Sequence, residues 1–168
     1  MRNYFLILLG LLLLSSCCKE YDCNPQKLIL SIKGVDTLNT DTLLIQTYTK
    51  GGDFTQLIKT DTIILADSTI ENMPFEVTMY SDTAVIRNYS SYNQYGIVSY
   101  ESDWKLITKN NTYLITDIAI KEEVGCCGGI LSIDCKKNCV SPITTYKLNG
   151  AVQTVNPDLY YNYLYLDN

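Results

Sequence analysis

Short apolar segments with a two-residue alternation recur along this 168-residue chain. Within residues 27–33, for example, Leu28, Leu30 and Ile32 fall on one face of an extended strand. Thr and Tyr are plentiful and Ala is scarce, a composition that favours strands over helices. No segment carries a long 3.6-residue period, and the one hint of a helical turn lies near Leu57. The pattern therefore predicts an all-β fold.

Strand signals follow one another at short intervals from residue 27 to the end of the chain. We expect strands over residues 27–33, 42–49, 62–65, 75–80, 84–89, 97–100, 104–108, 113–120, 145–148 and 151–154, and a last one within 159–166. Many short strands without intervening helices are typical of antiparallel sandwiches and barrels. We predict an antiparallel β-sandwich of about seven to nine strands.

The most definite local signal is Asn149-Gly150, which stands between the alternating segments 145–148 and 151–154. Asn and Gly adopt positive φ angles readily, and two-residue hairpin turns need such angles. We therefore predict a tight β-hairpin with these two residues at its turn.

The start of the chain contains a second constraint. Arg2 supplies a positive charge, residues 4–14 form an apolar run, and Leu14-Ser15-Ser16-Cys17 closes that run. The run is too short for a transmembrane helix, which needs about 20 residues, so it fits a cleaved signal. The four closing residues resemble the lipobox of bacterial lipoproteins. This resemblance implies cleavage before Cys17 and attachment of lipid, palmitate included, to Cys17.

The same resemblance divides the chain into three parts. Residues 1–16 would be the signal peptide, 17–26 a polar lipidated tether, and 27–168 the β-sandwich domain. An ordinary secretory signal with an incidental cysteine is the alternative. The expected location is the outer membrane of a double-membraned bacterium, on the surface or the periplasmic face. Glu20 and Asp22 in the tether loosely resemble a surface-export signal, although a solvated linker explains them equally well.

Charge and residue types exclude several functions. The net charge is −5, and it becomes −6 without residues 1–16, because Arg2 is their only charged residue. An acidic domain disfavours nucleic acid and charge-driven docking on anionic lipid. The chain has no histidine, which removes Ser-His-Asp and Cys-His catalysis, and it lacks G-x-S-x-G and phosphate-binding glycine motifs. We expect no enzyme, no catalytic residues and no cofactor; a hydrolase that uses only carboxylates is the alternative.

Cysteine usage predicts disulfides. Of seven cysteines, Cys17 would carry lipid, which leaves an even number in an exported chain. The candidates are Cys18, Cys23, Cys126, Cys127, Cys135 and Cys139. Cys126 and Cys127 are poor partners for each other, because consecutive Cα atoms lie about 3.8 Å apart and disulfides prefer roughly 4.4 to 6.8 Å. We expect each to pair with Cys135 or Cys139, and Cys18 and Cys23 to pair together or remain free.

Two residue groups could hold a metal ion, but neither matches a defined site. The four cysteines of residues 126–139 could bind zinc as thiolates, yet they lack paired C-x-x-C motifs. Asp36, Asn39 and Asp41 could offer oxygens to calcium, yet they form no defined calcium loop, and Asp and Asn are common in turns. We predict no metal site.

Two groups of tyrosines could form contact surfaces. The first group stands among Ser, Asn and Gln, which is typical of adaptable binding surfaces, and comprises Tyr89, Tyr92, Tyr95 and Tyr100. We expect this group to contact a glycan or another protein. In the second group, alternation would place Tyr161, Tyr163 and Tyr165 on one face of a last strand. The alternative for both groups is that the tyrosines fill half-buried sheet faces.

Five short segments share the order Asp, hydroxyl residue, then a small or apolar residue. This order resembles an O-glycosylation signal of exported proteins in some lipoprotein-rich bacteria. The resemblance implies sugar on Thr37, Thr42, Thr62, Ser68 and Thr83. The alternative is that Asp closes a turn and Thr opens a strand.

Residues 103–107 and 112–118 resemble a strand pair common in small bacterial lipoproteins with immunoglobulin-like or transthyretin-like sandwiches. This resemblance concerns the fold and not the function. Together the features predict a membrane-anchored, non-enzymatic envelope protein, a binding or accessory module for a glycan or an envelope protein. The alternative is a structural, assembly or adhesin-type component with an open edge strand.

Overall fold

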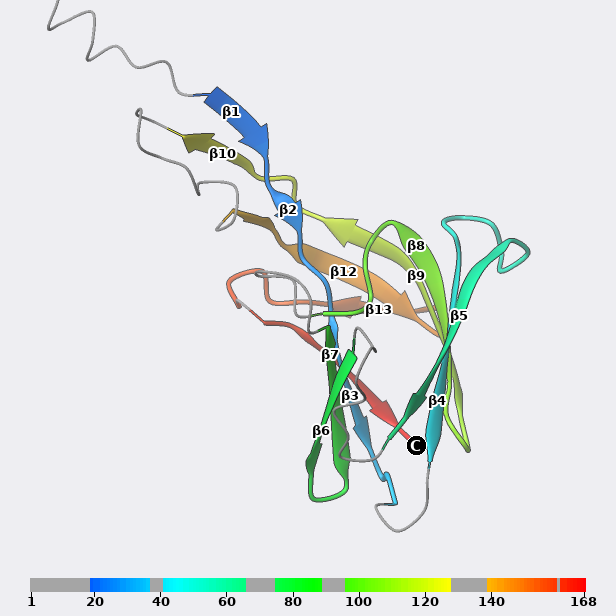
Figure 1. The fold of residues 1–168 in the computed structure, drawn as a ribbon. Helices are drawn as coiled ribbons and strands as arrows, with labels where there is room; N and C mark the ends of the chain where they lie inside the picture. The colour runs from blue at the N-terminus through cyan, green and yellow to red at the C-terminus, as the bar shows by residue number, and fades with distance from the viewer. Residues whose placement is uncertain (1–18, 37–40, 66–74, 89–95, 128–138, 160) are drawn as a thin grey trace, which may run out of the picture.

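The computed structural model describes residues 19–36, 41–65, 75–88, 96–127, 139–159 and 161–168 (Figure 1). All regular elements in these ranges are β-strands. Most of them belong to two sheets that pack against each other, which confirms the predicted all-β sandwich. Within the same ranges there is no helix with the length and hydropathy that a membrane span requires.

The larger sheet has six strands in the order β13-β12-β9-β8-β4-β5. Their bounds are β4 (Thr42–Thr49), β5 (Leu57–Ile64), β8 (Ser102–Ile107), β9 (Thr112–Ile120), β12 (Ile143–Leu148) and β13 (Ala151–Thr154). The smaller sheet has four strands in the order β14-β3-β7-β6. Their bounds are β3 (Ile29–Lys33), β6 (Phe75–Tyr80), β7 (Thr83–Asn88) and β14 (Tyr163–Asp167).

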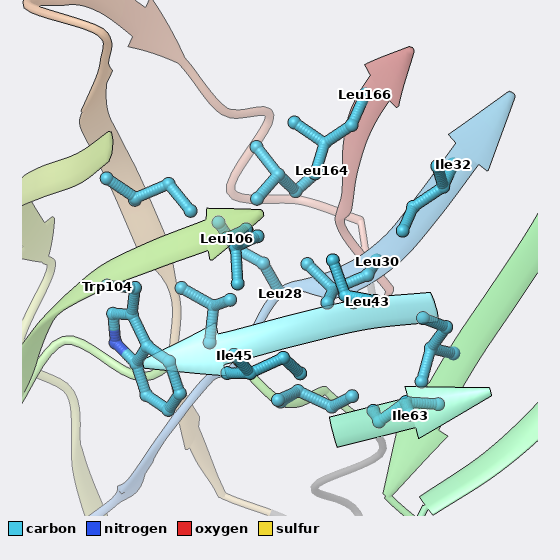
Figure 2. Close-up of a cluster of buried hydrophobic side chains, with 14 of the residues drawn as sticks. Leu28, Leu30, Ile32, Leu43, Ile45, Ile63, Trp104, Leu106, Leu164 and Leu166 are labelled. Atoms are coloured by element: carbon cyan, nitrogen blue, oxygen red, sulfur yellow. The ribbon is translucent and has the colours of Figure 1, made fainter. Parts of the chain in front are cut away.

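One hydrophobic core joins the two sheets (Figure 2). Alternation along β3 directs Leu30 and Ile32 toward the larger sheet, where Leu43 and Ile45 of β4 face them. All four side chains are at most 1% exposed. Full burial of one such side chain stabilises a fold by about 1.5 to 3 kcal/mol. This core therefore holds the sheets face to face.

Several predicted elements are confirmed. Residues 42–49 and 75–80 form β4 and β6 as expected. At the predicted hairpin, Asn149 and Gly150 have φ angles of 49° and 82°, and β12 pairs with β13 on either side of them. Positive φ at both positions matches the twist that a two-residue turn between strands requires.

Other elements differ from the prediction. The two main sheets contain six and four strands, more than the expected number. Leu57, near which the sequence hints at a helical turn, instead begins β5. Residues 97–100 contribute only an isolated bridge, between Val98 and Leu28. β14 runs parallel to β3, because it arrives by a crossover from the opposite sheet and no hairpin sets its direction.

Residues 19–26, predicted as part of a tether, are paired with the rest of the domain. β1 (Lys19–Asp22) forms an antiparallel ribbon with β10 (Val124–Cys127), and β2 (Asn24–Pro25) pairs in parallel with β11 (Val140–Ser141). The β1–β10 ribbon extends from one end of the sandwich (Figure 1). The sandwich domain thus begins before residue 27.

A disulfide joins Cys23 to Cys139, with their Cα atoms 4.8 Å apart. The pairing differs from the prediction, which placed Cys139 with Cys126 or Cys127. The reason is the strand pairing around it: the Asn24 amide donates to the Cys139 carbonyl at 3.1 Å, which brings residues 116 positions apart side by side. Cys18, Cys135 and the side chains of Cys126 and Cys127 lie outside the described part of the chain.

Gln26 forms a buried polar link beside this disulfide. Its side-chain oxygen accepts hydrogen bonds from the Ile143 amide and from Asn162 Nδ2, both at 3.1 Å. Its side-chain nitrogen donates to the Leu159 carbonyl at 3.2 Å. One amide group thereby connects the N-terminal segment, β12 and the connection before β14. Because its hydrogen bonds are satisfied, this buried amide stabilises one arrangement of the three segments.

The Cys23–Cys139 bond should be a major stabiliser of the mature protein. Because it closes a loop of more than 100 residues, replacing both cysteines by serine should lower the free energy of unfolding by about 3 to 5 kcal/mol. Urea unfolding followed by fluorescence of Trp104, the single tryptophan, measures this change. Reductant should weaken the wild type more than the double variant; equal stability of both proteins without reductant would contradict the bond.

Candidate functional site

The first predicted contact group is only partly described. Tyr89, Tyr92 and Tyr95 lie outside the described residues. Tyr100 is partly buried and packs against the hydrophobic core, with Lys50 Nζ 5.2 Å from the centre of its ring. Its environment is that of a structural aromatic with a neighbouring cation. A contact surface formed by this group stays a prediction.

The second tyrosine group lies on the outer face of the smaller sheet, the face turned away from the larger sheet. Tyr163 and Tyr165 alternate along β14 with Leu164 and Leu166, which are buried in the core. The two tyrosine rings stack, with centroids 6.0 Å apart and planes 28° from parallel. The predicted placement of Tyr163 and Tyr165 on one face is confirmed. Tyr161 precedes the strand and is 43% exposed.

Strand register brings Arg87 beside this tyrosine group. Tyr163 of β14 lies opposite Ile29 of β3. Leu30 lies opposite Ile86 of β7, so Ile29 neighbours Arg87 in the next row across the sheet. We call the residues Arg87, Tyr161, Tyr163 and Tyr165 the arginine–tyrosine face.

A cavity of about 260 Å³ opens on this face. Ile29, Arg87, Tyr161 and Tyr163 line it. Ile29 is 2% exposed although it points away from the core, and it forms an apolar lining between polar groups. The cavity is therefore a small amphipathic hollow with one cationic side chain.

Arg87 is the residue that sequence reasoning missed. Its Nε atom is buried and donates to no acceptor among the described residues, and no ion pair of its guanidinium occurs among them. Glu76 lies opposite Arg87 on β6, yet the two do not come within ion-pair distance. Arg87 is the only arginine after Arg2. A lone arginine on the outward side of a predicted strand was the signal available in the sequence.

Buried carboxylates elsewhere are already engaged. Asp41, a predicted calcium candidate, accepts from Asn168 Nδ2 at 2.9 Å and from the Asp36 amide at 3.2 Å, and Lys109 Nζ lies 3.5 Å away. Asn39 lies outside the described residues. Asp103 accepts from the Gly51 amide at 2.8 Å. These carboxylates accept hydrogen bonds from segments at opposite ends of β4.

Asp41 and Asp103 do not form a hydrolytic pair. Asp41 precedes β4, whereas Asp103 lies opposite Tyr48 near the other end of that strand. Seven residues of extended strand span about 23 Å. Glycosidase carboxylates stand about 5 to 9.5 Å apart. Among the described residues, no cluster of three or more acidic or cysteine side chains has metal-binding geometry.

A second hollow of about 440 Å³ lies at the base of the β1–β10 ribbon. Gln26, Glu123, Cys139 and Leu159 are among its lining residues. Two of the polar groups here have partners: Gln26 is bonded as described, and Glu123 pairs with Lys121 at 2.7 Å. The hydrogen bond to Glu123 and its charge raise the pKa of Lys121. Asp158 also lines the hollow, and none of the described lining residues is a cation that could hold an anionic ligand.

Three predicted glycosylation positions are described. Thr42 of β4 and Thr62 of β5 are exposed on the larger sheet, on the side away from the core. Thr83 opens β7, is partly buried, and donates from its hydroxyl to Asp82 at 3.2 Å. Thr37 and Ser68 lie outside the described residues. Modification at these sites stays a prediction.

Comparison with known proteins adds no identification, since no protein family, curated protein or solved structure matches the chain. Only the geometry of the arginine–tyrosine face therefore indicates what it could bind.

Arg87 should contribute little to folding, because its buried Nε is unsatisfied. We expect Arg87→Met to leave the free energy of unfolding unchanged or to raise it by up to about 1 kcal/mol, since an apolar isostere removes an unsatisfied polar group. Ile29→Ala is the matched control and should lower it by about 2 to 5 kcal/mol. Urea unfolding measures both. A loss above about 1 kcal/mol for Arg87→Met would identify Arg87 as a structural residue.

Proposed function

We propose that this protein is a lipid-anchored envelope protein that binds a glycan or another envelope protein and performs no chemistry of its own. The observation that carries the proposal is the arginine–tyrosine face: Tyr165 is 72% exposed and Tyr161 43%, beside a cationic side chain without a partner among the described residues. Tyrosine gives large contact area at low entropic cost, and its hydroxyl adapts to polar ligands. Folding uses little of this surface, which leaves it for a ligand.

The proposed anchor is Cys17, on the outer membrane. Support comes from the lipobox-like residues and from the position of β1, which begins two residues later and leads into the ribbon that extends from the sandwich (Figure 1). A four-residue strand spans about 13 Å. An acidic domain has no charge-driven attraction to anionic lipid, so the acyl chains would supply the membrane affinity.

A second candidate function is that of an assembly component. Among the described strands, β5 is the edge of the larger sheet and pairs only with β4. Leu57 and Ile58 on it are 52% and 62% exposed. An open edge with exposed apolar side chains can receive a strand from a partner. Lys59 and Asp61 form an ion pair on the same strand, and charges of this kind oppose edge pairing.

Anchoring is tested on whole cells. Wild-type protein should carry acyl chains on an N-terminal Cys17, and Cys17→Ser should abolish acylation and release the protein from the membrane fraction. Mass spectrometry of the N-terminal peptide and membrane fractionation measure the two effects. External protease then distinguishes the surface from the periplasmic face. Membrane retention of Cys17→Ser equal to that of the wild type would overturn the proposed anchor.

Binding is tested with the mature protein in detergent micelles on an array of envelope glycans. Replacing Tyr163 and Tyr165 by Ala should weaken retention about tenfold or more, because stacking of each ring is lost. Tyr80→Ala is the matched control: Tyr80 is 57% exposed but lies on β6, three strands and roughly 14 Å away from β14. Equal retention by the double variant and the control would reject this face as the binding surface.

A further inference from the structure

We propose that the cavity on the arginine–tyrosine face binds the carboxylate of an acidic sugar residue, such as a uronic acid. This inference rests on the proposed binding function and specifies its ligand. Arg87 would hold the carboxylate, and the tyrosines would hold the sugar ring.

Arg87 indicates an anionic ligand. It is partly buried and lines the cavity, and its buried Nε has no hydrogen-bond acceptor within the described residues. A buried donor without a partner is costly, and native proteins usually pair it. A carboxylate offers two oxygens in the planar geometry that the guanidinium fork matches. A bound carboxylate would therefore complete the site.

The surroundings of Arg87 favour a ligand with a single negative charge. Glu76 lies opposite Arg87 on β6, and the whole chain carries a net charge of −5. Glu76 does not line the cavity, so the ligand would approach from the Tyr161 and Tyr163 side. Among the described residues, Arg87 is the only cation that lines the cavity. A dianion such as phosphate would meet one cation and a nearby carboxylate, whereas a carboxylate is matched by Arg87 alone.

The tyrosines and the size of the cavity favour a sugar. Tyr163 lines the cavity, and Tyr165 stacks beside it with 72% of its surface exposed. Such adjacent rings offer both an apolar face and hydroxyls to a ligand that is itself amphipathic, as a pyranose is. The volume of about 260 Å³ lies just below the range of pockets for drug-sized ligands, which begins near 300 Å³. The cavity therefore suits one sugar residue, with its neighbours lying over Tyr165.

The experiment measures binding of acidic oligosaccharides to the mature protein in detergent micelles. The probes are trimers of galacturonate and of glucuronate, each with its neutral methyl ester, which keeps the ring and removes the charge. The wild type should bind at least one acid about tenfold more tightly than its ester. Arg87→Gln should remove this preference. Arg87→Lys should retain only part of it, because Lys lacks the planar fork.

A matched control separates the effect of Arg87 from the effect of any positive charge on this sheet. Lys33→Gln removes one positive charge from the same side of the smaller sheet, four residues or about 13 Å along β3 from Ile29. It should leave the acid preference intact. Loss of preference in Lys33→Gln equal to that in Arg87→Gln would overturn the role of Arg87.

Failure of this inference is distinguishable from failure of the proposed function. Equal binding of acids and esters by the wild type would overturn the carboxylate site and leave a glycan-binding face. Absence of binding to every acid at about 10 mM would also overturn it. If glycan retention that depends on Tyr163 and Tyr165 persists in that case, the binding function stands; if it is absent too, both fail.

Discussion

The sandwich and its outer face both depend on β3, a strand whose side chains are buried on both sides. Leu30 and Ile32 enter the core, while Ile29 and Ser31, on the opposite face, are only 2% and 7% exposed. β3 pairs with β14 on one edge and with β7 on the other. A shift of one residue in either pairing would exchange core and outer faces. The register that buries Leu30 is therefore the register that brings Tyr163 and Arg87 together.

Polar groups that hold the fold differ from the one that defines the candidate site. Gln26 and Asp103 are buried, and each has hydrogen-bond partners from distant segments. Asn168 has a buried oxygen without a partner, but its amide nitrogen bonds to Asp41 and to the Gly34 carbonyl. Arg87 has no such compensation among the described residues. Folding therefore leaves the Nε donor of Arg87 unsatisfied, which is the feature that the proposed ligand would use.

The sequence was informative wherever a local rule decides the structure. Alternation identified β4, β6 and the shared face of Tyr163 and Tyr165, and the Asn149-Gly150 turn followed from the φ angles that these residues tolerate. The parallel entry of β14 could not be predicted, because a crossover between sheets has no local signature. Pairing of Cys23 with Cys139 was missed for a similar reason. Spacing favours close partners, yet the entropy of closing a loop grows only slowly with its length.

The role of Arg87 at the candidate site could not be predicted from the sequence for the same reason, because it depends on a distant strand pairing. Its composition signal, a lone arginine after Arg2 in an acidic chain, is visible in the sequence. Its significance depends on Tyr161 and Tyr163, which arrive from the end of the chain through a pairing that only the fold reveals. For a charged residue that points outward from a strand, the sequence does not show whether the charge is solvated or enclosed by neighbouring side chains.

The Cys23–Cys139 bond also determines how a mechanical load enters the domain. On a protein held at Cys17, a pull from a ligand would first act on β1, whose hydrogen bonds to β10 can open one pair after another. Opening stops at Cys23, where the covalent bond passes the force to β11 and then to β12 in the larger sheet. Because β1 is already extended, opening its pairs adds almost no length. At Cys23 the load divides between the disulfide and β2, so the covalent bond relieves β3 of part of the tension.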